Sequence, residues 1–357
     1  MRTAFDGEET GMNGATAERA TPVTVSVIVL TYNHARYIRQ ALDSILAQET
    51  DFPYEILVGD DASTDGTQAI LREYARREPD RLRLFLHEKN MGASRNAYTL
   101  LMAARGKYLA TCEGDDYWCD REKLRIQVAY LEAHPAFSGC VHPCRIVDEW
   151  GRIRRDQRLE WVRQKPVFTL RDFQGIYLPG QYATFVRRNL FLDKTRDMSI
   201  VYQAHPMVAD RTTMMLYLLA GDIACIDRVM SCYRKVTRKD GVNLTTVAFR
   251  NNRSRVQEEQ KLLQSMEAYL SREKGCEIRF RRRRRELFCE AVFQWLRGAG
   301  GINLQTAGEL WRDGGYAPSY LLALPVQFVR KSGRYIEKRW LLADREGSGE
   351  AEKKKGE

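Results

Sequence analysis

An α/β fold with a largely parallel central sheet is predicted by three features of the first half of the chain. Val23 to Leu30 reads VTVSVIVL, a β-branched run typical of a strand buried on both faces. Further apolar runs follow at 54–59, 82–86 and 106–112. Segments with helical spacing separate them, at 37–48, at 66–77 and in a stretch ending near Ala104. This alternation is typical of βαβ units.

The later elements are less regular. The sequence predicts a helix over 122–134, a strand from Cys140 to Ile146, irregular structure over 150–200, a helix from Met207 to Ala220, and a turn plus a strand from Gly221 to Tyr233. Beyond about residue 245, Arg, Lys, Glu and Gln dominate with helical periodicity. We therefore expect a Rossmann-like mixed or parallel sheet flanked by helices, with a helical C-terminal extension.

The composition predicts four regions. The chain has 357 residues, 44% of them hydrophobic, which is ample for a large core. We expect a disordered polar leader over 1–21, an α/β domain over 22–244, a helical region over 245–345 and a disordered tail over 346–357. The eight cysteines form no CxxC pair, and no run of 18 apolar residues occurs. These features predict a cytoplasmic protein without a membrane-spanning helix.

The formal net charge of +10 indicates an anionic partner or substrate without identifying it. Arg279 and the run Arg281 to Arg285 are compatible with nucleic-acid binding, but a solvated face of an amphipathic helix is the favoured interpretation. A second basic, apolar stretch runs from Tyr320 to Trp340. Packing on the α/β domain explains such helices, and peripheral contact with the anionic inner face of a membrane is the open alternative. With 47 acidic residues in the chain, we expect no nucleic-acid partner.

Polar loops follow each of the first four predicted strands, at 31–34, 60–67, 87–96 and 113–118. In open α/β sheets, ligands bind outside the carboxyl ends of the strands. Because the carboxyl ends of parallel strands meet at one edge, these loops are predicted to form one site.

The last of these loops reads Glu113-Gly114-Asp115-Asp116-Tyr117-Trp118. Its carboxylates repel one another, and an apolar setting raises their pKa values. A hard divalent cation such as Mg²⁺ or Mn²⁺ removes that conflict, because it prefers oxygen ligands and often bridges to substrate phosphates. By itself, the segment is equally compatible with an acidic turn.

Two other loops carry candidate binding residues. Asp60 and Asp61 end a strand, where a carboxylate can accept hydrogen bonds from a nucleoside. Asp65 is predicted to be structural, in an Asx-turn or helix cap. Arg95 lies at the start of a helix, a position that suits a phosphate or a base edge, although a solvated Arg in an ordinary turn is the alternative.

Taken in order, the segments VSVIVLTYNHARYI, ILVGDDASTDGT, NMGASRN and GKYLATCEGDDYW resemble the family 2 glycosyltransferases of the GT-A fold. The resemblance covers about residues 22–240 and makes the α/β domain a GT-A catalytic domain. It implies an inverting, metal-dependent hexosyltransferase-type enzyme that uses a nucleotide-diphosphate sugar, with Mg²⁺ or Mn²⁺ bridging the diphosphate. The implied acceptor is a saccharide or lipid-linked saccharide, in cell-envelope or exopolysaccharide synthesis.

The resemblance also assigns nucleotide-sugar contacts. Thr31 and Tyr32 would contact the nucleobase, Asp61 with Asp60 would hold the nucleoside, and Arg95 would lie near the base or ribose.

The acidic loop corresponds to the family's DxD-type motif. Glu113 stands in place of the first Asp, and Asp115 is the expected metal ligand. Asp116 and Trp118, with Tyr117, would shape the sugar pocket or brace the loop.

The candidate general base is Asp210, because an inverting displacement needs a group that takes the acceptor proton. In the family this carboxylate begins a helix on the acceptor side, and Asp210 begins an apolar one. A helix N-cap role is the alternative, and Asp193 and Asp197 are weaker candidates. Members of the family often carry Tyr-Arg-x-His after the next strand, whereas this chain has Tyr233-Arg234-Lys235-Val236.

The missing His predicts that Arg234, Lys235 or Lys239 supplies positive charge to the diphosphate. The QxxRW signature of processive members is also absent, so we expect one sugar transferred per encounter.

Three alternatives compete with this interpretation. A nucleotidyltransferase of similar fold would need a Gly-rich basic loop after the first strand, where this chain has TYNH. A non-catalytic basic protein that binds nucleic acid or a membrane surface would rely on the Arg run. A degenerate transferase without activity is disfavoured by the presence of Asp61, Asp115 and Asp210.

Overall fold

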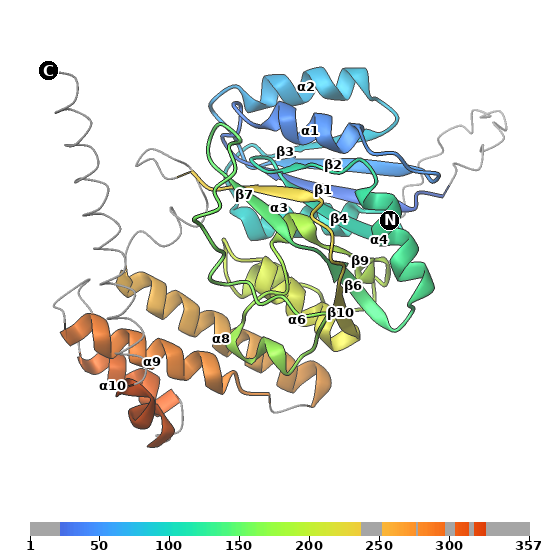
Figure 1. Cartoon of the computed structure of the whole chain (residues 1–357). Coiled ribbons are helices and arrows are strands. Elements are labelled where there is room, and N and C mark those ends of the chain that lie inside the picture. Colours follow the sequence, from blue (N-terminus) through green and yellow to red (C-terminus); the bar gives the residue numbers. More distant parts are fainter. Residues whose placement is uncertain (1–21, 237–251, 276–277, 297–303, 314–317, 326–357) are drawn as a thin grey trace, which may run out of the picture.

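The computed structural model describes residues 22–236, 252–275, 278–296, 304–313 and 318–325. A central sheet is covered by helices on both faces, and the C-terminal helices pack on one side of this α/β unit (Figure 1). The predicted leader over 1–21, the predicted tail over 346–357 and Lys239 lie outside the described residues.

The main sheet has eight strands in the order β3-β2-β1-β4-β9-β6-β10-β8. Most strands run in one direction, whereas β9 and β8 run against their neighbours. The strands are β1 (Val25–Thr31), β2 (Tyr54–Asp60), β3 (Leu82–Leu86), β4 (Tyr108–Glu113), β6 (Phe137–Val141), β8 (Val167–Phe168), β9 (Val186–Arg188) and β10 (Asp222–Cys225). The predicted largely parallel α/β fold is therefore confirmed.

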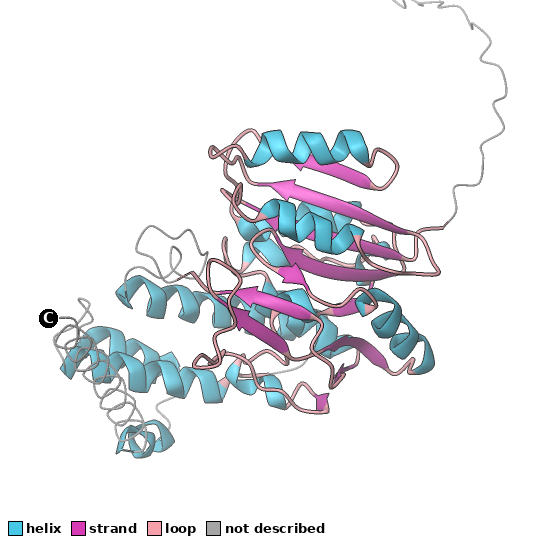
Figure 2. Cartoon of the chain, turned by 45° about the horizontal axis from the view of Figure 1, so that its top comes forward, coloured by secondary structure: helices cyan, strands magenta, loops and turns pink. Residues whose placement is uncertain are grey.

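Each face of the sheet carries its own apolar core, because successive strand residues point to opposite faces. Val27 and Val29 of β1 lie in one core with Leu42, whereas Ile28 lies in the other with Leu100. Figure 2 shows the strands layered between helices on both sides. The first core includes α1 (Ile38–Leu46), α2 (Thr67–Arg77) and α4 (Lys123–Ala133); the second includes α3 (Ala93–Ala103) and α6 (Asp210–Ala220).

A second, three-stranded sheet corrects two of the predictions. It has the order β5-β11-β7, with β5 (Tyr117–Trp118), β11 (Ser231–Arg234) and β7 (Cys144–Val147). The single strand predicted over 140–146 is divided between β6 and β7 at His142-Pro143, since proline has no N–H for a strand ladder. The region 221–233 holds two strands instead of one.

Strand β9 was not predicted, because the segment 150–200 showed no regular pattern. It lies between β4 and β6 and pairs antiparallel with both. Arg187 of β9 is fully buried, and its Nη1 donates to Thr111 Oγ1 at 2.7 Å. Two of the three residues of β9 are arginines, so the sequence lacks the apolar pattern that would predict a strand inside the sheet. The same segment contains α5 (Ile200–Gln203) and the short 3-10 helices Asp172–Gly175, Tyr182–Thr184 and Leu190–Leu192.

The predicted helical C-terminal region is present as α8 (Asn252–Lys274), α9 (Arg281–Leu296) and α10 (Leu304–Asp313). The prediction that the Arg run forms a solvated helix face is only partly correct. Arg281 and Arg282 are exposed, but Arg284 is buried and forms two hydrogen bonds with Glu267 of α8. Part of the basic charge is thus neutralised inside the protein.

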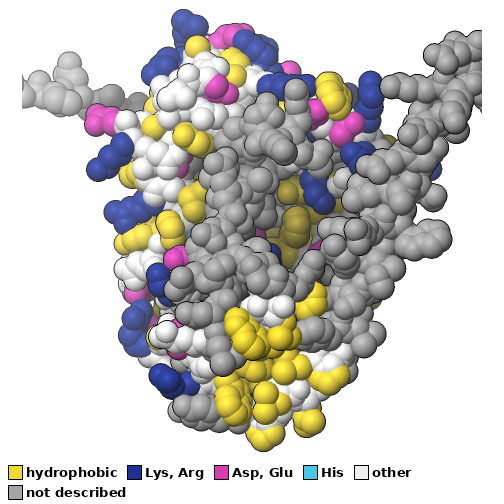
Figure 3. Space-filling view, turned by 90° about the vertical axis from the view of Figure 1, so that its left-hand side faces the viewer, with side chains coloured by type: hydrophobic (Ala, Val, Ile, Leu, Met, Phe, Trp, Pro, Cys, Tyr) yellow, Lys and Arg dark blue, Asp and Glu magenta, His cyan; other side chains and the backbone are white. Residues whose placement is uncertain are grey.

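The part of the chain that the structure describes contains no helix long and apolar enough to cross a membrane. Hydrophobic side chains gather on the face that carries the C-terminal helices (Figure 3). The exposed large hydrophobic residues include Trp295, Leu296, Leu321 and Leu322.

A buried lysine makes the stability of the fold depend on pH. Lys123 begins α4, is fully buried, and donates from Nζ to Gln127 Oε1 at 2.7 Å. Burial lowers the pKa of Lys123 to about 7 from the usual 10.5. Between these two values the unfolded chain binds more protons at this site than the folded chain. The contribution of Lys123 to the free energy of unfolding therefore rises with pH above about 7.

We expect Lys123→Met to remove this contribution. Between pH 7 and 9 the free energy of unfolding of the wild type should gain about 2 kcal/mol relative to that of Lys123→Met. The gain approaches ~1.4 kcal/mol per pH unit once Lys123 is neutral in the folded protein and still charged in the unfolded chain. Urea unfolding at pH 7, 8 and 9 measures the difference. Lys89→Met, at an exposed loop position, is the control and should run parallel to the wild type. Parallel pH profiles for the wild type and Lys123→Met would contradict a neutral lysine in the core.

Candidate active site

The loops after β1 and β2 are joined by hydrogen bonds between side chains and backbone. Asn33 N donates to Ser63 Oγ, and Thr64 N donates to Asn33 Oδ1, each at 2.8 Å. Asp65 accepts from Ala35 N at 2.9 Å and from Thr67 N at 3.1 Å. Asp65 thus links the two loops and the start of α2, in line with the structural role predicted for it.

Asp61 fixes the loop that leads into α3. Its Oδ1 accepts from Met91 N at 2.7 Å and its Oδ2 accepts from Gly92 N at 3.0 Å. Gly92 has a φ of 87°, a conformation that favours glycine. Because both oxygens of the buried Asp61 carboxylate already accept backbone bonds, its contacts favour holding this loop in place.

Thr31 Oγ1 and Asp60 Oδ1 are among the buried polar atoms at this edge that lack a hydrogen-bond partner within the described part of the chain, together with His34 Nδ1 and Ser94 Oγ. Thr31 and Asp60 lie opposite each other in the β1–β2 register. The other oxygen of Asp60 accepts from Ser63 N at 3.0 Å and from Gln68 Nε2 at 2.8 Å. A buried polar atom without a partner costs free energy, so this pair suits hydrogen bonds to a ligand or to water.

The acidic loop packs directly on the first loop. Gly114 N donates to Leu30 O at 2.8 Å. A Cβ at position 114 would lie 2.8 Å from His34 Nδ1 and 2.9 Å from Thr31 Cβ, which explains the glycine. His34 Nε2 lies 4.0 Å from Asp115 Oδ2, so the first loop reaches the predicted metal ligand.

Gln181 is a member of the site that the sequence did not reveal. Its Nε2 lies 2.9 Å from both Glu113 Oε2 and Asp116 Oδ2 and donates to them. Asp116 Oδ1 accepts from Arg234 N at 2.8 Å. Gln181 lies in the segment 150–200, whose sequence has no pattern that would place it against the acidic loop.

Arg234 supports the acidic loop from behind. Its buried guanidinium donates to four oxygens of the protein: Asp115 O at 2.8 Å, Asp148 O at 3.1 Å, Glu149 O at 3.2 Å and Gln40 Oε1 at 2.6 Å. These contacts favour a bracing role for Arg234 over direct contact with a diphosphate. Trp118 is also buried, and its Nε1 donates to Ala183 O at 3.3 Å. Of the two roles predicted for Trp118, its position favours bracing the loop.

The carboxylates of the site perturb one another. Burial, followed by the charges of Asp115 and Asp210, raises the pKa of Glu113 to about 8. Burial and the charges of Asp115 and Glu113 also raise the pKa of Asp116 well above its usual range. The charge of Asp210 contributes to the raised pKa of Glu113. The fold therefore brings together two carboxylate-bearing segments that are nearly a hundred positions apart in the sequence.

Asp210 is the first residue of α6 and is half-buried. The N-cap residue is Ala209, so Asp210 is not the N-cap of the helix. The preceding segment lies against the start of α3, where Ser94 N donates to Pro206 O at 3.0 Å. The weaker candidates for the base, Asp193 and Asp197, are exposed and bind neighbouring side chains and backbone.

The two remaining nucleotide candidates lie at the surface of the loops. Tyr32 is half-buried after β1. Arg95 is exposed, and its guanidinium carbon lies 4.3 Å from the centre of the Tyr202 ring. A cation–π contact with Tyr202 holds the Arg95 side chain beside the first turn of α3.

The acidic loop fits a cation that shares its ligands with a substrate. Among the described residues, no group of three or more His, Cys, Asp or Glu side chains is arranged to hold a metal ion. Mg²⁺ commonly binds through one or two carboxylates together with substrate phosphates, so a complete protein cage is not required. Asp115, whose side chain is 16% exposed, can be reached by a ligand, whereas Asp116 is buried.

Comparisons with known proteins indicate the family that the chain resembles. Residues 26–193 match the family model described as glycosyl transferase family 2. An uncharacterised protein of Mycobacterium tuberculosis is 37% identical over 212 residues, which cover 59% of this chain and 58% of the relative. The Staphylococcus aureus protein named poly(ribitol-phosphate) beta-N-acetylglucosaminyltransferase TarS is 35% identical over 113 residues, covering 30% of this chain and 19% of that protein.

Solved structures show the same fold. The crystal structure of S. aureus TarS 1-349 in complex with UDP-GlcNAc is similar with a TM-score of 0.54 and 19% identity, over 85% of this chain and 82% of that chain. The complex with UDP has a TM-score of 0.52 and 21% identity, over 77% and 72% of the two chains. The mixed α/β architecture is therefore of the GT-A type.

Proposed function

We propose that this chain, which carries a glycosyl transferase family 2 domain over residues 26–193, transfers a sugar from a nucleotide-diphosphate sugar to an acceptor hydroxyl. The observation that carries the proposal is the contact of the segment before α6 with the start of α3, where Ser94 N donates to Pro206 O at 3.0 Å, on the side of the acidic loop where the charge of Asp210 helps to raise the pKa of Glu113. This supports a diphosphate site and a candidate base that would lie together at the carboxyl edge of the sheet, where open α/β sheets bind ligands.

In the proposed reaction, the acceptor hydroxyl attacks the anomeric carbon as the bond from that carbon to the diphosphate oxygen breaks. Asp210 takes the hydroxyl proton, and the product has the inverted configuration. Asp115 would hold Mg²⁺ or Mn²⁺, which would supply positive charge to balance the leaving group. Gln181 and Arg234 hold the acidic loop in position.

The nucleoside would lie along the loops after β1 and β2. The unpartnered atoms Thr31 Oγ1 and Asp60 Oδ1 support this placement, with Tyr32 and Arg95 at its border. The sequence had favoured Asp61 as the residue that holds the nucleoside. Its two backbone bonds now favour Asp60 as the direct contact, with Asp61 shaping the loop.

The acceptor class is part of the proposal. A saccharide or lipid-linked saccharide of the cell envelope, or of an exopolysaccharide, is supported by a Bacillus subtilis relative, 36% identical over 115 residues, that is named putative teichuronic acid biosynthesis glycosyltransferase TuaG. Contact with a membrane surface is supported by the exposed Trp295, Leu296 and Leu322 on the C-terminal face.

A thermal-shift screen of UDP, GDP and CMP sugars, with and without Mn²⁺, tests the donor class. Because CMP sugars carry a single phosphate, a shift with a CMP sugar alone would contradict a diphosphate donor. We expect one nucleotide to raise the melting temperature, and Mn²⁺ to increase that rise. A ligand at 100 times its dissociation constant adds about 2.7 kcal/mol of stability, which is easily detected. The free nucleoside monophosphates are the control, since they lack the diphosphate that would bind the cation. The absence of any shift with all the donors would contradict the proposal.

A further inference from the structure

The segment that leads into Asp210 is held by the C-terminal helix α8. His205 Nε2 lies 3.8 Å from Glu258 Oε2. Arg211 Nη1 donates to Glu259 Oε1 at 3.1 Å. Two consecutive glutamates of α8 thus contact both ends of the segment 205–211, and this segment carries the candidate base.

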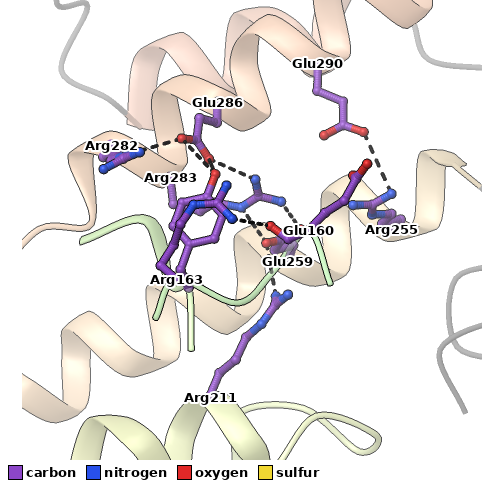
Figure 4. A network of polar contacts seen from close by, with 10 residues as sticks. Glu160, Arg163, Arg211, Arg255, Glu259, Arg282, Arg283, Glu286 and Glu290 are labelled. Carbon is purple, nitrogen blue, oxygen red and sulfur yellow. Dashed lines mark hydrogen bonds and ion pairs between the residues drawn. The ribbon is translucent and has the colours of Figure 1, made fainter. Parts of the chain in front are cut away.

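Glu259 is the centre of a buried ion network (Figure 4). It is 3% exposed, and it accepts two hydrogen bonds from Arg283 of α9, at 2.6 and 2.7 Å. Burial by itself would raise the pKa of Glu259, but Arg283 and then Arg211 outweigh it and lower the pKa to about 2. Glu259 is therefore an anion held by two arginines from different parts of the fold.

The network continues beyond Arg283, which makes the anchor rigid. Arg283 Nη1 donates to Glu286 Oε2 at 3.1 Å. Glu286 also accepts from the Tyr177 hydroxyl at 3.2 Å, from the region between β8 and β9. Arg211 is the member of the network that lies on α6.

The first turn of α6 has little support of its own. Its N-cap, Ala209, has no side chain that can bond to the free N–H groups of that turn. Arg211 N donates to Asp210 Oδ1 at 2.8 Å, so the position of the Asp210 carboxylate is coupled directly to that of Arg211. The ion pair between Arg211 and Glu259 ties this turn to α8.

We propose that Glu259 is a positioning residue, which holds Asp210 in its working place through Arg211. The C-terminal helices are then part of the catalytic apparatus and not only a covering layer. The inference rests on the proposed function, because it takes Asp210 as the group that receives the proton.

The test compares Arg211→Met with Glu267→Gln. Arg211→Met removes the contact to α6 but leaves the buried Glu259–Arg283 pair intact. Glu267→Gln is a matched control, because Glu267 also forms two hydrogen bonds with a buried arginine, Arg284, between α8 and α9. We measure kcat and the donor KM for nucleotide release from the donor that the thermal-shift screen identifies, and the melting temperature.

We expect Arg211→Met to lower kcat by about tenfold to a hundredfold with an unchanged donor KM, as is typical of a small displacement of a reacting group. Arg211→Lys should recover part of the loss, since a lysine can still reach Glu259. Glu267→Gln should lower the melting temperature while kcat stays at the wild-type value. Glu259→Gln combined with Arg211→Met should be no slower than Glu259→Gln alone, since both substitutions remove the contact between Arg211 and Glu259.

Either of two results would overturn this inference but leave the proposed function intact. One is an Arg211→Met protein with wild-type kcat. The other is a loss of kcat in Glu267→Gln as large as that in Arg211→Met, which would indicate general loosening of the C-terminal helices. A wild type that binds and cleaves none of the donors would overturn the proposed function, and the positioning role with it.

Discussion

Asp210→Asn is expected to lower the rate of sugar transfer by about 10²- to 10⁴-fold, the range typical for loss of a general base. The amide keeps the size of the side chain, and its oxygen can still accept the bond from Arg211 N. It cannot take up the acceptor proton. Nucleotide binding should remain, because Asp210 lies on α6 and the proposed nucleoside contacts lie on β1 and β2. Steady-state transfer rates and donor thermal shifts measure the two properties separately.

Asp193→Asn and Asp197→Asn are the controls, since both carboxylates are exposed and engaged in local contacts. Both variants should keep the wild-type rate. Retained turnover in Asp210→Asn would remove Asp210 from the role of base. A loss of turnover in Asp193→Asn, with Asp210→Asn active, would transfer the role to Asp193.

The regular half of the fold could be predicted because burial imposes a pattern on it. Strands such as β1 and β2 are covered on both faces, so they appear in the sequence as continuous apolar runs. The polar residues that interrupt these runs therefore mark the edge of the sheet. The four loops at that edge are therefore the predicted place of the site.

The remaining contacts depend on tertiary packing that leaves no periodic signal. Gln181 and Arg187 are polar residues in an irregular segment, yet both are buried against β4 or the loop that follows it. Polar residues are buried where hydrogen-bond partners exist, and those partners are distant in the sequence. Arg284 illustrates the same limit, because Glu267, which neutralises it, lies on another helix.

The site itself was only partly predictable for a similar reason. The sequence indicated which residues carry charge, but it did not indicate which charges are already satisfied. Asp61 and Arg234 are bonded to the protein at almost every polar atom, whereas Asp60 keeps an oxygen without a partner. That difference decides which side chains are available to a ligand.

Asp115→Ala is expected to abolish both transfer and the Mn²⁺-dependent part of the donor thermal shift. The described residues offer no cluster of three candidate ligands that could replace the lost carboxylate. Without metal, however, the variant should be at least as stable as the wild type. The charge of Asp115 is one cause of the raised pKa values of Glu113 and Asp116, so its removal relieves repulsion in the folded protein.

The combination of these two effects separates a binding role from a structural one. Melting temperatures without metal, with Mn²⁺, and with Mn²⁺ plus donor are measured for the wild type and for Asp115→Ala. A residue that holds the loop together would lower the first value, whereas a metal ligand lowers only the gain from Mn²⁺ and donor. Asp120→Ala is the control, because Asp120 binds Arg228 outside the acidic loop and its loss should leave that gain unchanged. An equal Mn²⁺-dependent gain in Asp115→Ala and the wild type would show that the cation is held elsewhere. Functional sites often keep such unfavourable charges because ligand binding needs them, and stability is reduced as a result.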